Sequence, residues 1–179
     1  MPIIETKQFM ITEHLPYPDL KIVKEMVYDP CGFKLSNLKL HSESVDYSAC
    51  SFELDGHKIE YRASKITPTK VGQFVTIWKR NREGVTAPFD VLDALDFVVV
   101  TSRSGANIGQ FIFPKSVLVA KGIVSQNGKG GKRGIRVYHP WDTVTNKQAE
   151  RTQKWQMNYF VRIDGTNDTD LNLIKRMFE

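Results

Sequence analysis

The alternation of apolar and polar positions predicts that the middle of the chain is rich in β-strands. An alternating run over residues 50–54 is followed by the dipeptide Asp55-Gly56, and the alternation resumes over residues 58–63. Asp and Gly both tolerate the positive φ that the two central positions of a tight hairpin turn require. The pattern therefore predicts a β-hairpin.

The stretch of residues 61–81 predicts a second pair of strands. Proline cannot donate to a strand ladder, so Pro68 separates two runs, and Gly72 gives the backbone freedom for the second run to start. Residues 73–80 then alternate and predict one strand. Its two faces are expected to hold Phe74, Thr76 and Trp78 on one side and Val75, Ile77 and Lys79 on the other.

Further along, four consecutive apolar residues, 97–100, predict a buried central strand, because a strand covered on both faces tolerates such a run. Residues 109–113 and 135–138 predict two more strands. The remaining segments are assigned from their glycine and proline residues and from their polarity. They are a strand or loop over 33–45, a helical turn over 88–95 and a polar loop over 102–107. A helix over 116–120, ended by Gly122, and a flexible loop over 126–134 follow.

Three stretches have helical spacing. An apolar stripe from Leu20 to Val27 begins after Pro18 and ends at Asp29-Pro30. Thr145 and Gln148 have the spacing of a capping box, which predicts a helix to about residue 160, and a last amphipathic helix is expected over 171–178. We expect an extended arm or strand over 1–15 and a turn over 165–168.

Together these elements predict a single domain, residues 1–179, of the α+β class. Its centre is expected to be a mixed, mostly antiparallel sheet of about five strands with helices flanking it.

Composition excludes several classes of protein. With 41% hydrophobic and 25% charged residues, the chain has the make-up of a globular protein rather than a disordered one. No apolar run approaches the roughly 20 residues that span a bilayer, so we expect no membrane association. Cys31 and Cys50 are too few for a disulfide framework or a metal cage, which favours a reducing compartment, the cytoplasm.

Charge is distributed unevenly along the chain. Residues 1–60 carry six Lys/Arg and ten Asp/Glu, whereas residues 61–136 carry thirteen Lys/Arg and four Asp/Glu, within a net charge of +5. No acidic residue occurs between Phe97 and Trp141. A segment of one sign favours a polyanion as partner, because each phosphate neutralised by Lys or Arg releases a counterion. A basic face without a ligand is the alternative.

Most catalytic motifs are absent from the sequence. Segment 126–134, QNGKGGKRG, lacks the spacing of a phosphate loop, although its cations would allow it to close over a phosphate backbone. A surface hairpin without function is the other interpretation. No Cys-x-x-Cys pair or Gly-x-Ser-x-Gly elbow occurs, and none of the histidines, His14, His41, His57 and His139, has metal-ligand spacing to another.

A magnesium-dependent nuclease stays open as an enzymatic alternative, because it would use the same basic groove. Such nucleases place an Asp on one hairpin strand and an acid-x-Lys pair on the next. Here Ile77 stands where the acid before Lys79 is required, and Glu60-Tyr61-Arg62 has Arg, a poor proton shuttle, in place of Lys. The candidate residues of a nuclease with displaced ligands are Asp55, Glu60, Lys65 and Lys79.

Several motifs resemble the bacterial MepB family: TPTKVGQFVTIWKRN (67–81), GVTAPFD (84–90), GQFIFPKSVLVAKGIVS (109–125), KRGIRVYHPWD and NKQAERTQKWQ. The resemblance covers most of residues 47–160. It implies a fold similar to restriction endonucleases of the PD-(D/E)xK type, and therefore a nucleic-acid-binding scaffold. The altered acid-x-Lys pair departs from the endonuclease pattern and puts cleavage in doubt.

We therefore expect a protein that binds nucleic-acid phosphates in a basic cleft, without a cofactor, and with Mg²⁺ only under the nuclease alternative. Exposed aromatic rings, Trp78 and Trp141 first among them, would stack on bases and favour single-stranded DNA or RNA over duplex. A third alternative is an interaction module whose basic face meets an acidic protein. The expected binding residues are Arg62, Lys65, Lys70, Trp78, Lys79, Arg80, Arg82, Lys115, Lys129, Lys132, Arg133 and Arg136.

Overall fold

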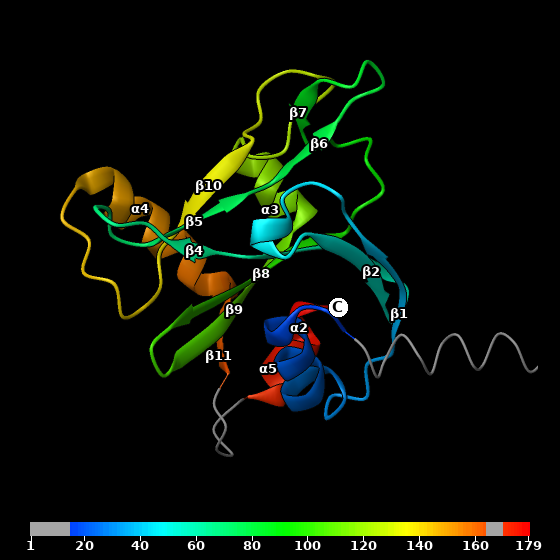
Figure 1. Ribbon diagram of the computed structural model, residues 1–179. Coiled ribbons are helices and arrows are strands. Elements are labelled where there is room, and N and C mark those ends of the chain that lie inside the picture. Colours follow the sequence, from blue (N-terminus) through cyan, green and yellow to red (C-terminus); the bar gives the residue numbers. More distant parts are fainter. Residues whose placement is uncertain (1–14, 164–169) are drawn as a thin grey trace, which may run out of the picture.

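A mixed sheet of six strands forms the centre of the protein (Figure 1). The structure is a computed structural model, and it describes residues 15–163 and 170–179. β3 and β8 run parallel, and the other neighbours in this sheet are antiparallel. The α+β class is confirmed, with six strands rather than about five. In spatial order they are β1 (Leu35–Leu40), β2 (Cys50–Leu54), β3 (His57–Ala63), β8 (Phe97–Ser104), β9 (Asn107–Pro114) and β11 (Phe160–Ile163).

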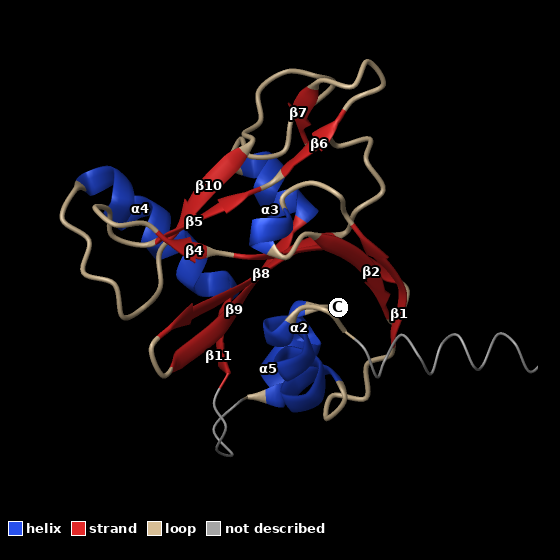
Figure 2. Cartoon of the chain, viewed as in Figure 1, coloured by secondary structure: helices blue, strands red, loops and turns tan. Residues whose placement is uncertain are grey.

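One face of this sheet packs against short helices that lie far apart in the sequence (Figure 2). These are α2 (Pro18–Val23), the π-helix η1 (Lys24–Tyr28) and α5 (Leu171–Met177). Helices this short are marginal by themselves, so the apolar cluster that they share with the sheet stabilises them. The predicted stripe from Leu20 to Val27 lies in that cluster and is confirmed.

The opposite face packs against a second cluster formed by two helices and a small sheet. The helices are α3 (Lys115–Ala120) and α4 (Lys147–Gln156). The small sheet has the order β10 (Gly134–Val137), β5 (Gln73–Thr76) and β4 (Lys65–Ile66). α4 lies beside this small sheet, as Figure 1 shows.

Strand β8 is covered on both of its faces. Val99 packs in the first cluster, whereas Val98 and Val100 pack in the second. Side chains alternate along a strand, so both clusters need apolar residues from the same segment. The prediction that residues 97–100 form a buried central strand is confirmed.

The prediction of one strand over residues 73–80 is wrong, because the run is divided between two sheets. β5 ends at Thr76, and β6 (Trp78–Arg80) pairs with β7 (Thr86–Pro88) in a separate two-stranded sheet. Between them, the Ile77 amide donates to the carbonyl of Arg133 at 2.9 Å. The alternation itself persists, since Val75 and Ile77 are both buried in the second cluster.

Turns were predicted with mixed success. Asp55 and Gly56 have φ values of 49° and 83°, so the hairpin between β2 and β3 is confirmed. The polar loop over 102–107 is wrong: β8 and β9 continue to Ser104 and Asn107, and a two-residue turn joins them. Polar side chains do not prevent pairing, because the ladder bonds are made by the backbone. The helical turn over 88–95 is also wrong: Pro88 ends β7, Asp90 forms an isolated bridge with Ser125, and the residues that follow form turns rather than a helix.

The C-terminal region differs from the prediction in its boundaries. The side chain of Asn146, rather than that of Thr145, caps α4 by accepting from the Ala149 amide at 2.8 Å. The helix ends at Gln156, a 3₁₀ turn η3 (Met157–Tyr159) follows, and β11 then forms an edge of the large sheet. The predicted strands near 109–113 and 135–138 and the helices near 116–120 and 171–178 are confirmed.

Several expectations concern the remaining segments. Residues 35–40 of the stretch left as strand or loop form β1, and a 3₁₀ turn η2 (Val45–Tyr47) precedes β2. Cys31 and Cys50 are buried free thiols. In the described part of the chain, no helix has the length and apolar character needed to cross a bilayer. Nearly all of the arm predicted over 1–15 and the turn predicted over 165–168 lie outside the described residues.

The close contact between Gly109 of β9 and Phe160 of β11 allows a test of how the edge strand β11 packs. A Cβ at this position would lie 2.1 Å from the Phe160 ring and 2.9 Å from the carbonyl oxygen of Val161. We expect Gly109→Ala to lower the free energy of unfolding by about 1 to 3 kcal/mol, because β11 must shift. Urea denaturation measures this, with the exposed Ser116→Ala as control. Equal stability of the two variants would contradict the close packing of β11 on β9.

Candidate functional site

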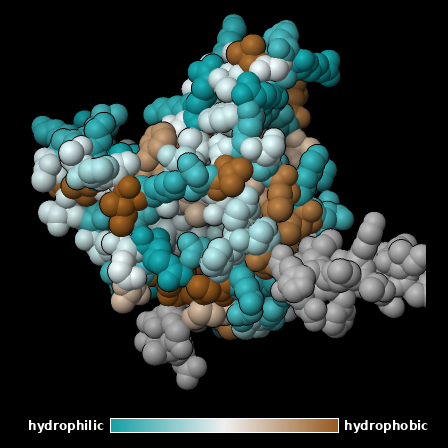
Figure 3. Space-filling view, in the orientation of Figure 1, coloured by the Kyte–Doolittle hydropathy of each residue, from teal (hydrophilic) through white to brown (hydrophobic). Residues whose placement is uncertain are grey.

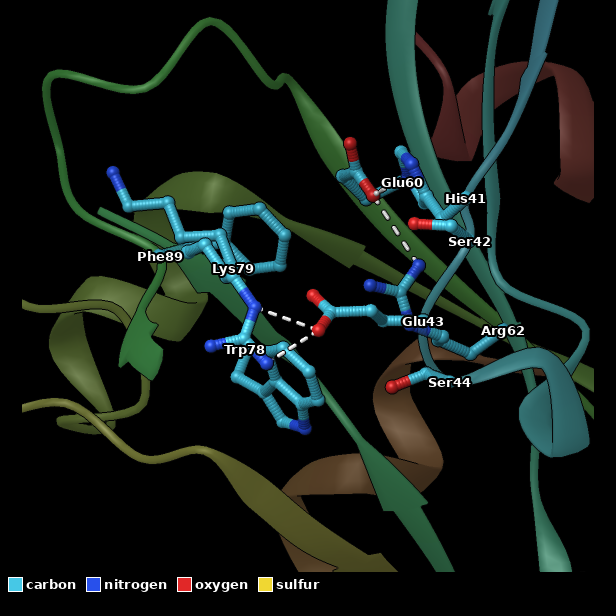
Figure 4. A pocket seen from close by; sticks show the side chains of 10 residues that line it. His41, Ser42, Glu43, Ser44, Glu60, Arg62, Trp78, Lys79 and Phe89 are labelled. Atoms are coloured by element: carbon cyan, nitrogen blue, oxygen red, sulfur yellow. Dashed lines mark hydrogen bonds and ion pairs between the residues drawn. The ribbon is translucent and has the colours of Figure 1, made fainter. Parts of the chain in front are cut away.

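Seven of the twelve expected binding residues line two separate hollows. The first, which we call the arginine pocket, has a volume of about 260 Å³. Figure 4 shows the labelled side chains of Glu43, Arg62 and Trp78 converging in it. Its walls come from the segment after β1 and from β3, β6 and the residue after β7. The lining residues are His41, Ser42, Glu43, Ser44, Glu60, Arg62, Trp78, Lys79, Arg80 and Phe89.

Arg62 is the buried centre of the arginine pocket, with 2% of its surface exposed. Its Nη1 donates to the carbonyl of Tyr61 at 2.8 Å and to Glu60 Oε2 at 3.2 Å, and its Nε donates to the carbonyl of Thr76 at 3.1 Å. His41 Nε2 lies 3.1 Å from the same Glu60 oxygen. Burial lowers the pKa of Arg62, and the charge of Glu60 opposes that lowering. Glu60 therefore supports a charge that is otherwise costly to bury.

Acidic residues of the first third of the chain pair with several of the expected cations. Arg80 binds Glu43, with Nε 2.6 Å from Oε1. Lys65 lies 3.8 Å from Asp46, and Arg103, outside the expected set, binds Asp19 at 2.8 Å. From the middle of the chain, Asp93 holds Lys79 at 2.5 Å. Around the arginine pocket, positive charge is therefore largely matched by negative charge.

The second hollow, which we call the basic groove, contains no matching acids. It has a volume of about 660 Å³ and lies between the small sheet and the start of α4. Lys70, Lys132 and Arg136 line it, and none of its described lining residues is acidic. These three cations form no ion pair within residues 15–163 and 170–179. The other lining residues are Thr69, Val71, Phe74, Ile123, Gly134, Ile135, Tyr138, Val144, Thr145, Asn146, Gln148, Ala149, Thr152 and Gln156.

Two backbone carbonyls and one side-chain hydroxyl hold Arg136 in the groove. Its Nη1 donates to the carbonyls of Val71 and Gly72 at 3.1 and 3.2 Å, and its Nη2 donates to Thr67 Oγ1 at 2.9 Å. Neutral acceptors orient the guanidinium without cancelling its charge. Lys70 and Lys132 are exposed. The groove therefore combines one oriented cation with two that are accessible to solvent.

A buried glutamine joins α4 to the free edge of the small sheet and so forms the floor of the groove. Gln156 is 1% exposed. Its Oε1 accepts from the Tyr138 amide at 2.8 Å, and its Nε2 donates to the carbonyl of Arg136 at 3.1 Å. One side chain thus makes both hydrogen bonds that a neighbouring strand would make at this edge.

The segment between β10 and α4 is anchored by His139, which is fully buried. Its Nδ1 lies 2.8 Å from Asp142 Oδ2, and Gln153 Nε2 donates to its carbonyl at 2.7 Å. Nε2 of this ring is buried without a hydrogen-bond partner among the described residues. Burial lowers the pKa of His139, whereas Asp142 raises it. The histidine is neutral in the folded protein at neutral pH and holds this wall of the groove.

The other expected cations lie outside both hollows. Lys115 of α3 donates to the carbonyl of Asp93, and Arg133 donates to that of Thr86 in β7, so each bond connects a loop to a neighbouring helix or strand. Arg82 and Lys129 are exposed. The loop at 126–134, expected to be flexible, is hydrogen-bonded to Asp90, whose Oδ2 accepts from the Gly128 amide at 2.9 Å. That bond, with further donors from Ser125 and Leu92, lowers the pKa of Asp90 to about 2.

The expected aromatic residues differ in how much of each ring is accessible. Trp78 carries the guanidinium of Arg80 over its ring at 5.6 Å. Trp141 stacks on His139 with ring centroids 4.7 Å apart. Tyr138 is half-buried and lines the basic groove. Of the rest, Tyr61 and Phe113 are buried, and Trp155 packs partly buried against the second cluster.

The alternative nuclease residues are not assembled around one point. Asp55 lies at the hairpin turn and accepts from the Lys34 amide at 2.8 Å, whereas Glu60 and Lys79 line the arginine pocket and Lys65 lies on β4. In the described part of the chain, no three His, Cys, Asp or Glu residues are grouped so that they could hold a metal ion. With Glu60 already engaged by Arg62 and His41, these residues do not fit a magnesium site, which needs several oxygen ligands.

Sequence reasoning missed four residues that shape these sites: His41, Glu43, His139 and Gln156. His139 and Gln156 lie within the quoted family motifs, but the motifs do not show their roles, and each of the four acts through a partner at least three positions away in the sequence. The acidic composition of residues 1–60 indicated that acids such as Glu43 could pair with later cations, but it did not indicate which cation Glu43 pairs with.

The ion pair between Arg62 and Glu60 leads to a prediction about the stability of the fold. Glu60→Ala leaves Arg62 buried without its carboxylate, so we expect the free energy of unfolding to fall by about 3 kcal/mol. Glu43→Ala, the matched control, removes the partner of the exposed Arg80 and should cost no more than about 1 kcal/mol. Urea denaturation of both variants measures this. Similar losses would show that Arg62 does not depend on Glu60.

The lowered pKa of His139 leads to a prediction about how the stability of the fold depends on pH. Because its pKa is lowered in the folded state, the unfolded chain binds the proton first as pH falls below about 6.5. The stability that the neutral His139 contributes to the fold is complete above that pH, and it is lost as the pH falls toward the pKa of His139 in the folded state. Denaturation at pH 7.5 and pH 5.5 should show a smaller pH-dependent loss in His139→Phe than in the wild type. Equal losses would contradict the assignment.

Comparison with known proteins gives the family. Residues 41–162 match the MepB-like family profile. The crystal structure of MepB is 30% identical with a TM-score of 0.72, and the match covers 84% of this chain and 99% of MepB. A bacterial homing endonuclease matches at 16% identity and a TM-score of 0.39, over 72% of this chain and 80% of its own, too low a similarity to bear on activity. No curated protein matches. The profile spans more than half of the sequence, and the chain belongs to the MepB-like family.

Proposed function

We propose that this protein binds nucleic acid through phosphate contacts in the basic groove, without cleaving it. The observation that carries the proposal is the placement of Lys70, Lys132 and Arg136 in one hollow whose described lining has no acidic residue. Cations with no carboxylate nearby are available to neutralise phosphates and release counterions. The resemblance noted in the sequence, which implies a nucleic-acid-binding scaffold, supports the same assignment.

The three cations suit a phosphate backbone in different ways. Arg136 is fixed by neutral acceptors and presents a planar donor group, which suits a phosphate oxygen pair. Lys70 and Lys132 are exposed point charges that adapt to the path of a strand. Such contacts set position and carry no sequence information, so binding should tolerate many sequences.

Single-stranded DNA or RNA is the preferred form under this proposal. Tyr138 lines the groove with a half-buried ring, and an unpaired base can stack on such a ring. Polar uncharged groups from Thr145, Asn146, Gln148 and Thr152 line the same hollow and would form hydrogen bonds with bases or sugars. A duplex offers no free base faces to Tyr138. We place this activity in the cytoplasm.

An interaction module for an acidic protein has less support. The face seen in Figure 3 is mostly hydrophilic, with hydrophobic side chains in small separate groups. Protein interfaces usually have an apolar centre with charges at the rim. The magnesium-dependent nuclease gains no support from the placement of Asp55, Glu60, Lys65 and Lys79 described above.

Salt dependence tests the groove directly. We expect Lys132→Gln to weaken binding of poly-dT and of a mixed-sequence oligonucleotide alike, and to lower the slope of log affinity against log salt by about 0.7, the value for one phosphate on a single strand. Fluorescence anisotropy over a salt series measures this. Lys34→Gln is the matched control, an exposed lysine outside both hollows.

Two outcomes would reject the groove. One is an unchanged slope in Lys132→Gln. The other is a reduced slope in Lys79→Gln with none in Lys132→Gln, which would place phosphate binding at the arginine pocket instead.

A further inference from the structure

We propose that the arginine pocket is a separate binding site for a phosphate monoester, and that Glu43 occupies the place of that phosphate when the site is empty. The shared chemistry is a terminal phosphate, whether on a free nucleotide or at the phosphorylated end of a strand. This inference goes beyond the basic groove, because it concerns a different hollow and a different group.

The first reason is the incomplete hydrogen bonding of Arg62. Its Nε and Nη1 donate to Thr76, Tyr61 and Glu60, but its Nη2 has no hydrogen-bond partner among the described residues, and the side chain lines the pocket. The residue is almost entirely buried. An unpartnered guanidinium nitrogen on a side chain that lines a cavity is a donor available to an anion, and a phosphate oxygen is well suited to it.

The second reason is the contact of Glu43 with Arg80. The Glu43 carboxylate binds the guanidinium through Nε at 2.6 Å and Nη2 at 2.5 Å, a geometry in which a phosphate can replace it. Both side chains are well exposed, at 38% and 49%, so the pair contributes little to stability and opens at low cost. Glu43 lies in the segment after β1, next to Ser44, which has a φ of 53°.

The third reason is the balance of charge in the pocket. Arg62, Lys79 and Arg80 bring three cations to the lining, against the carboxylates of Glu43 and Glu60 in the lining and that of Asp93, which holds Lys79. Glu60 is held by Arg62 and His41 and is not free to leave. If Glu43 swings out, the pocket holds one more cation than carboxylates, and this excess of positive charge attracts an anion such as a phosphate monoester.

Size and wall chemistry define the ligand further. A volume of about 260 Å³ is just below the roughly 300 to 1,000 Å³ of ordinary ligand pockets, so the site accommodates a small group rather than a length of strand. Trp78 and Phe89 form an apolar wall against which a sugar or base can pack. A nucleoside monophosphate, or one terminal nucleotide with its phosphate, fits this description.

The experiment is isothermal titration calorimetry with inorganic phosphate, adenosine 5′-monophosphate and adenosine. We expect the two phosphates to bind and adenosine not to bind. Glu43→Gln should bind adenosine 5′-monophosphate at least about threefold more tightly, because the internal competitor is weakened, and Arg80→Gln about tenfold more weakly. Arg82→Gln, an exposed arginine outside the pocket, and Lys132→Gln in the groove should bind it as the wild type does.

A comparison of oligonucleotides that carry a 5′-phosphate or a 5′-hydroxyl distinguishes the two possible sources of the phosphate, a strand end and a free nucleotide. If the phosphorylated strand binds more tightly than the hydroxyl strand, and Arg80→Gln loses this difference, the ligand is the end of a strand. If both strands bind equally while adenosine 5′-monophosphate still binds, the ligand is a free nucleotide. The proposal is overturned if neither phosphate binds to the wild type or to Glu43→Gln at about 10 mM. It is equally overturned if Glu43→Gln does not strengthen binding.

Discussion

Ion pairs between the acidic first third of the chain and the basic middle third determine where positive charge remains exposed. Asp19, Glu43, Asp46 and Glu60 each hold a cation that follows later in the sequence. A carboxylate in contact with a cation largely cancels its attraction for a distant phosphate. The uneven charge of the sequence is therefore partly neutralised on folding, and part of the excess lies in the basic groove.

The groove in turn depends on how the small sheet is attached to α4. Gln156 replaces a missing strand at the edge of β10, and His139 fixes the segment that joins the two elements. Gly72 allows Tyr138 to lie close to the backbone, because a Cβ there would meet the tyrosine ring at 2.8 Å. The groove and the arginine pocket thus differ in kind. In the groove neutral acceptors orient the charge, whereas in the pocket carboxylates compensate it.

Local signals explain what could be predicted from the sequence. Asp55-Gly56 fixes a turn by its own backbone preferences, the 97–100 run requires burial on both faces, and the stripe from Leu20 to Val27 requires a partner surface. These predictions held because each depends on neighbours in the sequence. The division of the 73–80 run at Ile77 and the edge strand β11 depend on distant partners, Arg133 and Phe111, and no local pattern contains them.

The candidate sites show the same limit. Three of the cations expected from the sequence, Lys70, Lys132 and Arg136, line the basic groove. The sequence did not identify which cations are paired, because a partner such as Glu43 lies 37 positions from Arg80. Net charge along a sequence therefore overestimates the charge that the folded surface offers.

Lysine acylation, read by mass spectrometry with and without a saturating 5′-hydroxyl oligonucleotide, tests the central claim most directly. If the unpaired cations of the groove hold the strand, Lys70 and Lys132 lose reactivity on binding, while Lys65 and Lys79, which are paired with Asp46 and Asp93, do not change. Protection of Lys65 and Lys79 with unchanged reactivity at Lys70 and Lys132 would contradict the account.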